Sequence, residues 1–326
     1  MRRLCIVTSA ACLLACLPAP LLAAGAARII DMHLHAFPAS FFGPSPPPIC
    51  VGARFRAVDP ATGYDDPAAF EDCPAPLAPA RSDDELRDRT LALLERYDIV
   101  AVASGPARIV KDWESKAPQR IIPALIVTGH EPVTPEIRAR FESGEFRVIG
   151  EILAQYAGLA PSGEALDSWF AMAEELDIPV ALHMGPGPPA ATYTDSPGYR
   201  AALGRPLGLE PVLVKYPRLR LYIMHAGYPY LDELLAILYA YPQVHVDVGI
   251  INYNSPREEF HRYLERIVRA GFGDRVMFGS DQMIYPDAIA AAIESIESAA
   301  FLSAAEKRAI LHDNAARFLR LGADGR

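Results

Sequence analysis

The sequence lacks any block of basic residues. Its 326 residues include 31 lysines and arginines against 40 aspartates and glutamates, which gives a formal net charge of -9. A protein that follows a phosphate backbone needs clustered positive charge. We therefore expect no nucleic-acid partner, and the composition suits an enzyme with an acidic surface.

Long hydrophobic runs are also missing, except at the N-terminus. Two arginines precede an apolar run over 4–17, and small residues at 24–26 suit a signal peptidase. Two prolines interrupt the run before it reaches the roughly 20 apolar residues that a membrane span needs. We predict a signal peptide over 1–26, export to the periplasm or the medium, and no transmembrane span in the mature chain. A lipid anchor on Cys16, which ends the lipobox-like Leu-Leu-Ala-Cys, is the alternative.

Cysteine is scarce as well. Of the five cysteines, three lie in the predicted leader, which leaves Cys50 and Cys73 in the mature chain. Neither has the C-x-x-C spacing of a zinc knuckle. In an oxidising compartment the pair predicts a disulfide that closes a loop of about 23 residues. Two unpaired thiols are the alternative.

Apolar, β-branched segments alternate with segments of helical periodicity from residue 28 onward. This alternation is typical of a parallel α/β fold. The expected strands number eight: 28–35, 99–105, 120–127, 146–153, 178–184, 219–227, 244–251 and 275–281. Eight strands in one series favour a closed (β/α)8 TIM barrel over an open sheet, and we expect 27–326 to form a single domain.

Helices are expected between these strands. The segment 82–97 opens with Ser-Asp-Asp-Glu, a capping box, and carries leucines at helical spacing. The other expected helices are 134–143, 163–176, 208–215, 230–240, 256–270 and 285–300.

One tract departs from the alternation. Residues 37–80 are rich in proline and glycine and are unusually long for a connection. Because the tract follows the first strand, we expect it at the C-terminal face of the barrel, where active sites lie. We interpret it as an insertion that forms a lid over the site, stapled by Cys50 and Cys73. An irregular surface excursion is the alternative.

Metal-binding residue types end several of the expected strands. His33 and His35 close the first strand, and their spacing of two places both imidazoles on one face. His183 ends the fifth strand, His225 the sixth and Asp281 the eighth. The C-terminal ends of barrel strands converge on one mouth, so these five groups predict a metal site there.

This set of residues, in this strand order, resembles the amidohydrolase superfamily and its amidohydrolase-related branch. The Phe-Gly-Ser-Asp281 segment and the closing Asn314-Ala-Ala-Arg-Phe are also similar to that family. The resemblance implies one or two divalent metal ions, with Zn2+ favoured and Mn2+ as the alternative, held by a first-strand H-x-H, two strand-end histidines and the eighth-strand aspartate.

The fourth strand adds a further candidate ligand. Glu151 lies in Val-Ile-Gly-Glu-Ile, where some amidohydrolases place a carboxylated lysine or a glutamate that bridges two metals. A carboxylate can offset the charge of two neighbouring cations, which a neutral residue cannot. We expect Glu151 to share a face with Ile149 and Leu153. A Glu that pairs with an arginine or orients a ligand is the alternative.

Substrate contacts are expected from loops at the same end of the barrel. The candidates are Tyr193, Tyr199, Arg200, Asn252 and Tyr253. Aromatic rings and one arginine suit a small organic substrate with a carboxylate or a sugar-like ring, although ordinary loop packing explains them equally. His130 follows the third strand and could approach the site, but the family pattern does not require it. The sequence positions of His245, Asp247, His261 and His312 give no reason to expect them in the site.

The function expected is metal-assisted hydrolysis of a small ester, lactone or amide. Asp281 is placed to accept the proton of the attacking water, and His225 to bind metal or polarise the carbonyl. Asp31 is expected to orient a ligand from below. The alternatives are a single-metal decarboxylase of the same superfamily and a non-catalytic periplasmic metal-binding barrel. Each of these three functions is compatible with a homo-oligomer.

Overall fold

Eight parallel strands form the centre of the molecule. The structure is a computed structural model that describes residues 28–64 and 71–322. Neighbouring strands pair in chain order, as in a TIM barrel: β1 (Ile29–His35), β6 (Ile99–Gly105), β7 (Ile121–Val127), β8 (Val148–Ile152), β9 (Val180–His183), β10 (Leu221–Met224), β11 (His245–Asp247) and β12 (Val276–Met277). The leader predicted over 1–26 lies outside the described residues.

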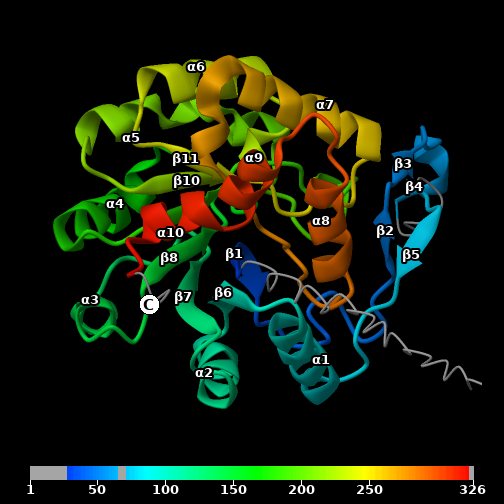
Figure 1. Cartoon of the computed structure of the whole chain (residues 1–326), viewed down its shortest axis with the longest axis horizontal. Helices are drawn as coiled ribbons and strands as arrows, with labels where there is room; N and C mark the ends of the chain where they lie inside the picture. Colours follow the sequence, from blue (N-terminus) through cyan, green and yellow to red (C-terminus); the bar gives the residue numbers. More distant parts are fainter. Residues whose placement is uncertain (1–27, 65–70, 323–326) are drawn as a thin grey trace, which may run out of the picture.

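Hydrogen bonds between the first strand and the end of the last one bring the sheet close to a closed barrel. Met32 N donates to Phe278 O over 2.9 Å, and Asp281 N donates to His33 O over 2.6 Å. Figure 1 shows the strands surrounded by helices. The predicted (β/α)8 TIM barrel is therefore confirmed.

One helix or more separates each pair of consecutive barrel strands. They are α1 (Asp83–Arg96), α2 (Ala107–Lys116), α3 (Pro135–Glu142), α4 (Glu164–Leu176), α5 (Glu210–Lys215), α6 (Leu231–Ala240) and α7 (Arg257–Ile267), with α8 (Ala288–Glu297), α9 (Ala304–Arg308) and α10 (Asn314–Leu319) after β12. The sequence did not reveal α2, because Pro106 stands at its start and no side chain caps it. At α1, Ser82 accepts from Glu85 N, but the Glu85 carboxylate accepts from Arg81 N rather than completing the capping box.

Alternate strand residues belong to two different apolar clusters. Val100 and Val102 of β6 pack with Tyr222 inside the barrel, where Phe318 of α10 covers the bottom. Ile99 and Ala101 pack outward with helix residues such as Trp113. The period of two along each strand therefore separates a core inside the barrel from a larger core between barrel and helices.

The connection from β1 to α1 carries two small antiparallel sheets. The first pairs β2 (Ile49–Val51) with β5 (Ala75–Leu77), and the second pairs β3 (Arg54–Phe55) with β4 (Glu71–Asp72). Figure 1 shows these strands at one edge of the molecule, beside α8. Backbone bonds attach them to the loop after β11, because Gly52 N donates to Tyr253 O over 2.8 Å.

A disulfide between Cys50 and Cys73 links the two halves of this connection, as the sequence predicted. Their Cα atoms lie 5.4 Å apart, within the usual range for the bond. Asn254 Nδ2 also donates to Cys50 O over 3.1 Å, so the staple is joined to the barrel loop after β11.

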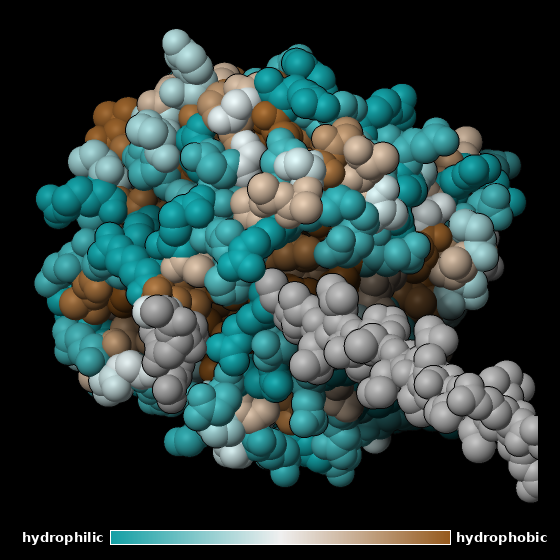
Figure 2. All heavy atoms as spheres, in the orientation of Figure 1, coloured by the Kyte–Doolittle hydropathy of each residue, from teal (hydrophilic) through white to brown (hydrophobic). Residues whose placement is uncertain are grey.

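The face of the molecule drawn in Figure 2 is mostly hydrophilic. On the face drawn in Figure 2, apolar residues appear only in separate patches among hydrophilic ones. None of the helices within 28–64 and 71–322 combines the length and apolarity that crossing a bilayer requires.

We predict that protein recovered from the periplasm carries the Cys50–Cys73 bond and that its removal destabilises the fold. The double variant Cys50→Ala/Cys73→Ala should lose up to about 3 kcal/mol of unfolding free energy, since the bond restricts the unfolded chain. Intact-mass spectrometry with and without alkylation tests the bond, and urea denaturation tests the stability. Two alkylated thiols in unreduced protein would contradict the prediction.

Candidate metal centre

Six side chains that could bind metal converge at the C-terminal ends of the barrel strands. Each is at most 5% exposed, so the cluster is shielded from bulk water. The six are His33 and His35 of β1, Glu151 of β8, His183 of β9, His225 directly after β10, and Asp281 after β12. The structure thus brings together all the predicted ligands.

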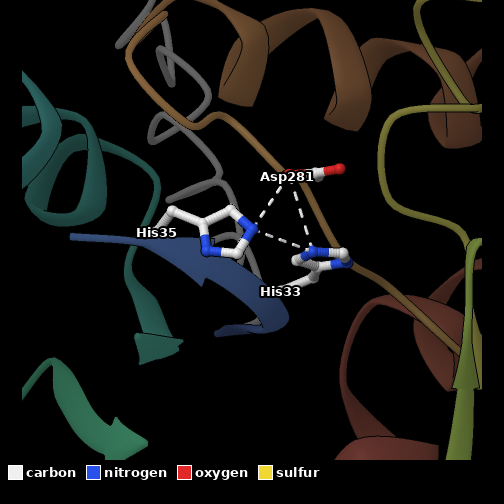
Figure 3. Close-up of side chains that lie close together, drawn as sticks. All are labelled: His33, His35 and Asp281. Carbon is white, nitrogen blue, oxygen red and sulfur yellow. Dashed lines mark hydrogen bonds and ion pairs between the residues drawn. The ribbon is translucent and has the colours of Figure 1, made fainter. Parts of the chain in front are cut away.

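The first three ligand atoms form a small triangle. His33 Nε2 lies 3.2 Å from His35 Nε2, and Asp281 Oδ1 lies 3.5 Å from the former and 3.2 Å from the latter. Figure 3 shows both rings and the carboxylate directed at one another. Ser104 Oγ, 3.0 Å from His35 Nδ1, helps to hold the His35 ring with its Nε2 facing the triangle.

The other three ligands form a second group beside the first. Glu151 Oε1 lies 2.6 Å from His183 Nδ1 and 3.8 Å from His225 Nε2, and the two imidazole nitrogens lie 3.0 Å apart. Glu151 Oε2 is 3.5 Å from His35 Nε2, so its carboxylate lies between the two groups. Glu151 belongs to the second set of three donors and lies at its boundary with the first set.

A bulge in β8 directs Glu151 into the site. Ile149 pairs with Val180 and Ile152 pairs with Leu182, so β8 uses three residues where β9 uses two. Ile149 and Ile152 both pack outward, and the extra residue turns Glu151 inward. Bulges next to active sites commonly redirect a side chain in this way. Our expectation that Glu151 shares a face with Ile149 was therefore wrong.

A similar irregularity in β1 places the histidine pair. The register with β6 shifts between Asp31 and Leu34, so Asp31 and His33 do not continue one regular face. Asp31 Oδ1 accepts from the backbone N of His33 and of Ser280, each over 2.9 Å. Asp31 therefore holds the backbone of the site through His33 and Ser280.

Two of the predicted substrate residues brace the loop that carries Asp281. Asp281 adopts a left-handed φ of 47°, which costs free energy unless the surroundings impose it. Tyr253 Oη donates to Asp281 O over 3.0 Å, and Asn252 Nδ2 donates to Gly279 O over 2.9 Å. Both side chains are buried, so their observed contacts are with backbone carbonyls.

The remaining substrate candidates lie in the loop after β9. Tyr193 is 69% exposed and stacks on Tyr64 of the β1–α1 connection. Tyr199 Oη accepts from Gly187 N over 2.9 Å. The Arg200 guanidinium is exposed and donates to backbone carbonyls of its own loop.

Asp247 belongs to the site, although the sequence analysis left it out. It is fully buried at the end of β11, and His33 Nδ1 donates to Asp247 Oδ1 over 3.4 Å. It also accepts from the backbone N of His225 and of Gly249. By accepting from His33 Nδ1, the Asp247 carboxylate favours the neutral tautomer whose Nε2 is free to bind a metal. An aspartate that ends a barrel strand two residues before a glycine was the signal available.

Close backbone approach around His33 requires glycine. A Cβ on Gly249 would lie 2.6 Å from His33 Nδ1, which no side chain can accept. The ring of His33 is thus packed directly against the loop that follows β11.

The negative charges of the buried carboxylates are balanced by a proton on a histidine of the site. Burial alone would lower the pKa of His33, but the carboxylates of Asp281 and Asp247 raise it to about 10. Burial opposes ionisation of Asp281, yet His33 and His35 lower the pKa of that carboxyl to about 2. Charged His33 therefore supplies the positive charge that the buried carboxylates need.

The donor set fits a divalent cation. Asp281 Oδ1 is buried without a hydrogen-bond partner, and each trio of donor atoms lies within 4.8 Å of one another. Imidazole and carboxylate donors without thiolate suit Zn2+ and also Mn2+. Such an ion would take over the role of the proton on His33.

Comparisons with known proteins agree with this arrangement. The profile of the amidohydrolase family matches residues 30–321. A search of curated proteins found no significant match.

Solved structures share the fold. A probable 2-pyrone-4,6-dicarboxylic acid hydrolase from Acinetobacter baumannii is 15% identical, with a TM-score of 0.57 over 90% of this chain and 100% of its own. An uncharacterised TIM-barrel protein from Bordetella bronchiseptica is 20% identical, with a TM-score of 0.55 over 77% and 88%. The IDCase of Metarhizium anisopliae is 17% identical, with a TM-score of 0.52 over 90% and 97%.

We predict that metal binding releases about one proton at pH 7 to 8, because His33 must lose its proton before Nε2 can bind a metal. At that pH the free protein holds the proton, since the His33 pKa lies near 10. Calorimetric titration with Zn2+ in buffers of different ionisation enthalpy measures the release. An enthalpy that is independent of the buffer would contradict the account.

We also predict that His183→Ala and His225→Ala each lower bound metal while the barrel stays folded, since strand-end residues serve the site more than the core. Elemental analysis measures the metal, and circular dichroism checks the fold. His130→Ala is the matched control, because His130 is an exposed histidine just after β7. Full metal occupancy in both site variants would remove these residues from the centre.

Proposed function

This chain belongs to the amidohydrolase family, and from that premise we propose that it is a metal-dependent hydrolase that cleaves a small ester, lactone or amide. In TIM-barrel enzymes, the C-terminal ends of the strands surround one mouth, and the residues there contact the substrate. The proposal concerns the reaction class, and it rests on the side chains gathered at that mouth.

The position of Glu151 carries the proposal. Its two oxygens lie 2.6 Å from His183 Nδ1 and 3.5 Å from His35 Nε2, between the two groups of ligands. A carboxylate in this position supports two cations side by side, which is the arrangement of many metal-dependent hydrolases. A single-metal decarboxylase has no need of a ligand there.

The two ligand groups divide the six residues between them. His33, His35 and Asp281 would hold one ion, and His183 and His225 the other, with Glu151 between them. The bound metal would supply Lewis acidity, which lowers the pKa of water and polarises the substrate carbonyl.

His225 is better suited to bind metal than to polarise a carbonyl oxygen. Its Nδ1 donates to Gly249 O over 3.0 Å, so the neutral ring presents the Nε2 lone pair to the site. A lone pair can bind a cation, whereas polarisation would require a proton at that atom.

Asp281 is the proposed general base and acid. Its Oδ1 is buried and receives no hydrogen bond. Burial alone would raise the pKa of this carboxyl, but the charge of His33 lowers it to about 2. The ionised carboxylate can accept the proton of the attacking water and return it to the leaving oxygen or nitrogen. The Tyr253 hydroxyl and the backbone of β1 keep it in position.

We predict that Glu151→Gln lowers the metal content from about two ions to about one and removes most turnover, because the amide keeps the shape but loses the charge. Elemental analysis of the purified protein measures the metal. A panel of lactones, esters and amidated amino acids measures the activity.

Glu142→Gln is the matched control, since Glu142 is an exposed glutamate on α3 that pairs with Arg138. A value near one ion in both the parent protein and Glu151→Gln would reject the bridge. It would also favour a single-metal enzyme, which includes the decarboxylase alternative.

A further inference from the structure

We propose that the Cys50–Cys73 disulfide is a redox-sensitive positioning element for Asp281, so that the metal ion bound by this carboxylate is released faster when the disulfide is reduced. Metal retention is the property affected, and the premise is the proposed metal centre rather than the class of reaction. The contacts that carry the proposal join the β1–α1 connection to the two loops beside Asp281.

One side of the connection is bonded to the loop after β11. Gly52 N donates to Tyr253 O over 2.8 Å, and Ala53 N donates to Asn254 O over 2.7 Å. In the opposite direction, Asn254 Nδ2 donates to Cys50 O over 3.1 Å. Cys50 is fully buried at this junction. These three bonds fix the end of β2 against residues 253 and 254.

Tyr253 extends this restraint to the metal ligand. Its backbone carbonyl accepts from Gly52, while its side-chain hydroxyl donates to Asp281 O over 3.0 Å. The ring is buried, so bulk water has little access to the second bond. Asp281 has a left-handed φ of 47°, a conformation that a residue other than glycine keeps only under restraint. One tyrosine therefore joins the stapled connection to the backbone of Asp281.

The connection also holds the loop that follows Asp281. Tyr285 Oη donates to Pro47 O over 2.7 Å, and Ala80 N donates to Ile284 O over 2.9 Å. Pro47 precedes β2 and Ala80 follows β5, so both ends of the small β2–β5 sheet are bonded to this loop. Asp281 therefore lies in a segment that the connection restrains from two sides.

The disulfide supplies a restraint that the backbone pairing of the connection provides only weakly. Two-stranded sheets of this kind are marginally stable in water. β2 and β5 pair over three residues each, and Pro76, which lies opposite Cys50, has no N–H to donate. The covalent bond from Cys50 to Cys73 therefore keeps β2 in the position from which it contacts Tyr253.

Reduction would remove this restraint without changing any residue. A small dithiol gives two electrons and two protons to the disulfide, which yields the thiols of Cys50 and Cys73 and the cyclic disulfide of the reagent. Cys73 is only partly buried, so the bond can be approached from its side. Segment 50–53 can then separate from Tyr253. The backbone of Asp281 gains freedom, and its carboxylate dissociates from the ion more often.

The first test measures Zn2+ release from the loaded mature chain into an excess of a chromogenic chelator. Cys50→Ala/Cys73→Ala leaves no thiol to bind zinc. It should release the ion about tenfold faster than the parent, the effect expected when one buried hydrogen bond is lost. Parent protein treated with a phosphine reductant should match the variant, and reoxidation should restore slow release. Equal release rates with and without the disulfide would overturn the proposal.

A double-mutant cycle identifies the route. Tyr253→Phe removes the hydroxyl that donates to Asp281 but keeps the ring, so it should also speed release. If the disulfide acts through this hydroxyl, adding Cys50→Ala/Cys73→Ala to Tyr253→Phe should change the rate by less than about threefold. A full tenfold effect in both backgrounds would overturn the assignment of Tyr253 as the link.

Val110→Ala is the control for overall stability. Val110 is buried in the outer core on α2, which packs on β6 and β7. Its truncation weakens the core but should keep Zn2+ release within about twofold of the parent rate. Equal acceleration in Val110→Ala and in the variant without the disulfide would overturn the proposal, because release would then follow the stability of the whole fold.

Hydrogen exchange provides a readout that needs no metal. Asp281 N donates to His33 O over 2.6 Å. In metal-free protein, this amide should exchange about tenfold faster when the disulfide is removed and should be little changed by Val110→Ala. Exchange that is unaffected by loss of the disulfide would overturn the positioning role.

The outcome is separable from that of the hydrolase proposal. If no ester, lactone or amide is turned over but loss of the disulfide speeds both Zn2+ release and exchange, the reaction class fails and the positioning role stands. If turnover occurs while release and exchange are unchanged, the reverse holds.

Discussion

Three carboxylates buried in the mouth of the barrel set the constraint on which the site depends. Glu151, Asp247 and Asp281 are each at most 5% exposed, and no lysine or arginine is buried anywhere in 28–64 and 71–322. Buried charge without compensation is costly, so the surrounding imidazoles must carry protons or the group must hold a cation. The pKa of His33, raised to about 10 against the effect of burial, shows how strongly the cluster attracts positive charge. A divalent cation bound by these side chains would neutralise the buried carboxylates.

The barrel meets this demand through small departures from regularity. Bulges in β1 and β8 direct His33 and Glu151 into the mouth. Loop bonds from Asn252 and Tyr253 hold the segment that carries Asp281. The stapled β1–α1 connection is bonded to that same loop region, so the site and the insertion share one support.

Much of this could be predicted from the sequence, and the rest could not for identifiable reasons. Eight apolar segments implied the barrel, and polar residues at their ends implied the site, because strand ends of a parallel barrel must converge. The facing of Glu151 could not be predicted, since one extra residue in a strand reverses the alternation and leaves no mark in the sequence. Asp247 went unassigned because its role depends on a contact with His33, which is 214 residues away. Tyr156, which borders His183, was missed because it lies in a loop beyond the strand end.

The central claim is that these six side chains enclose a divalent metal. The most direct test is anomalous diffraction at the zinc edge from crystals grown with Zn2+. The account predicts strong density within bonding distance of His33 Nε2, His35 Nε2 and Asp281, with a second peak on the far side of Glu151, next to His183 and His225. Crystals with zinc bound elsewhere and none in the barrel mouth would contradict it.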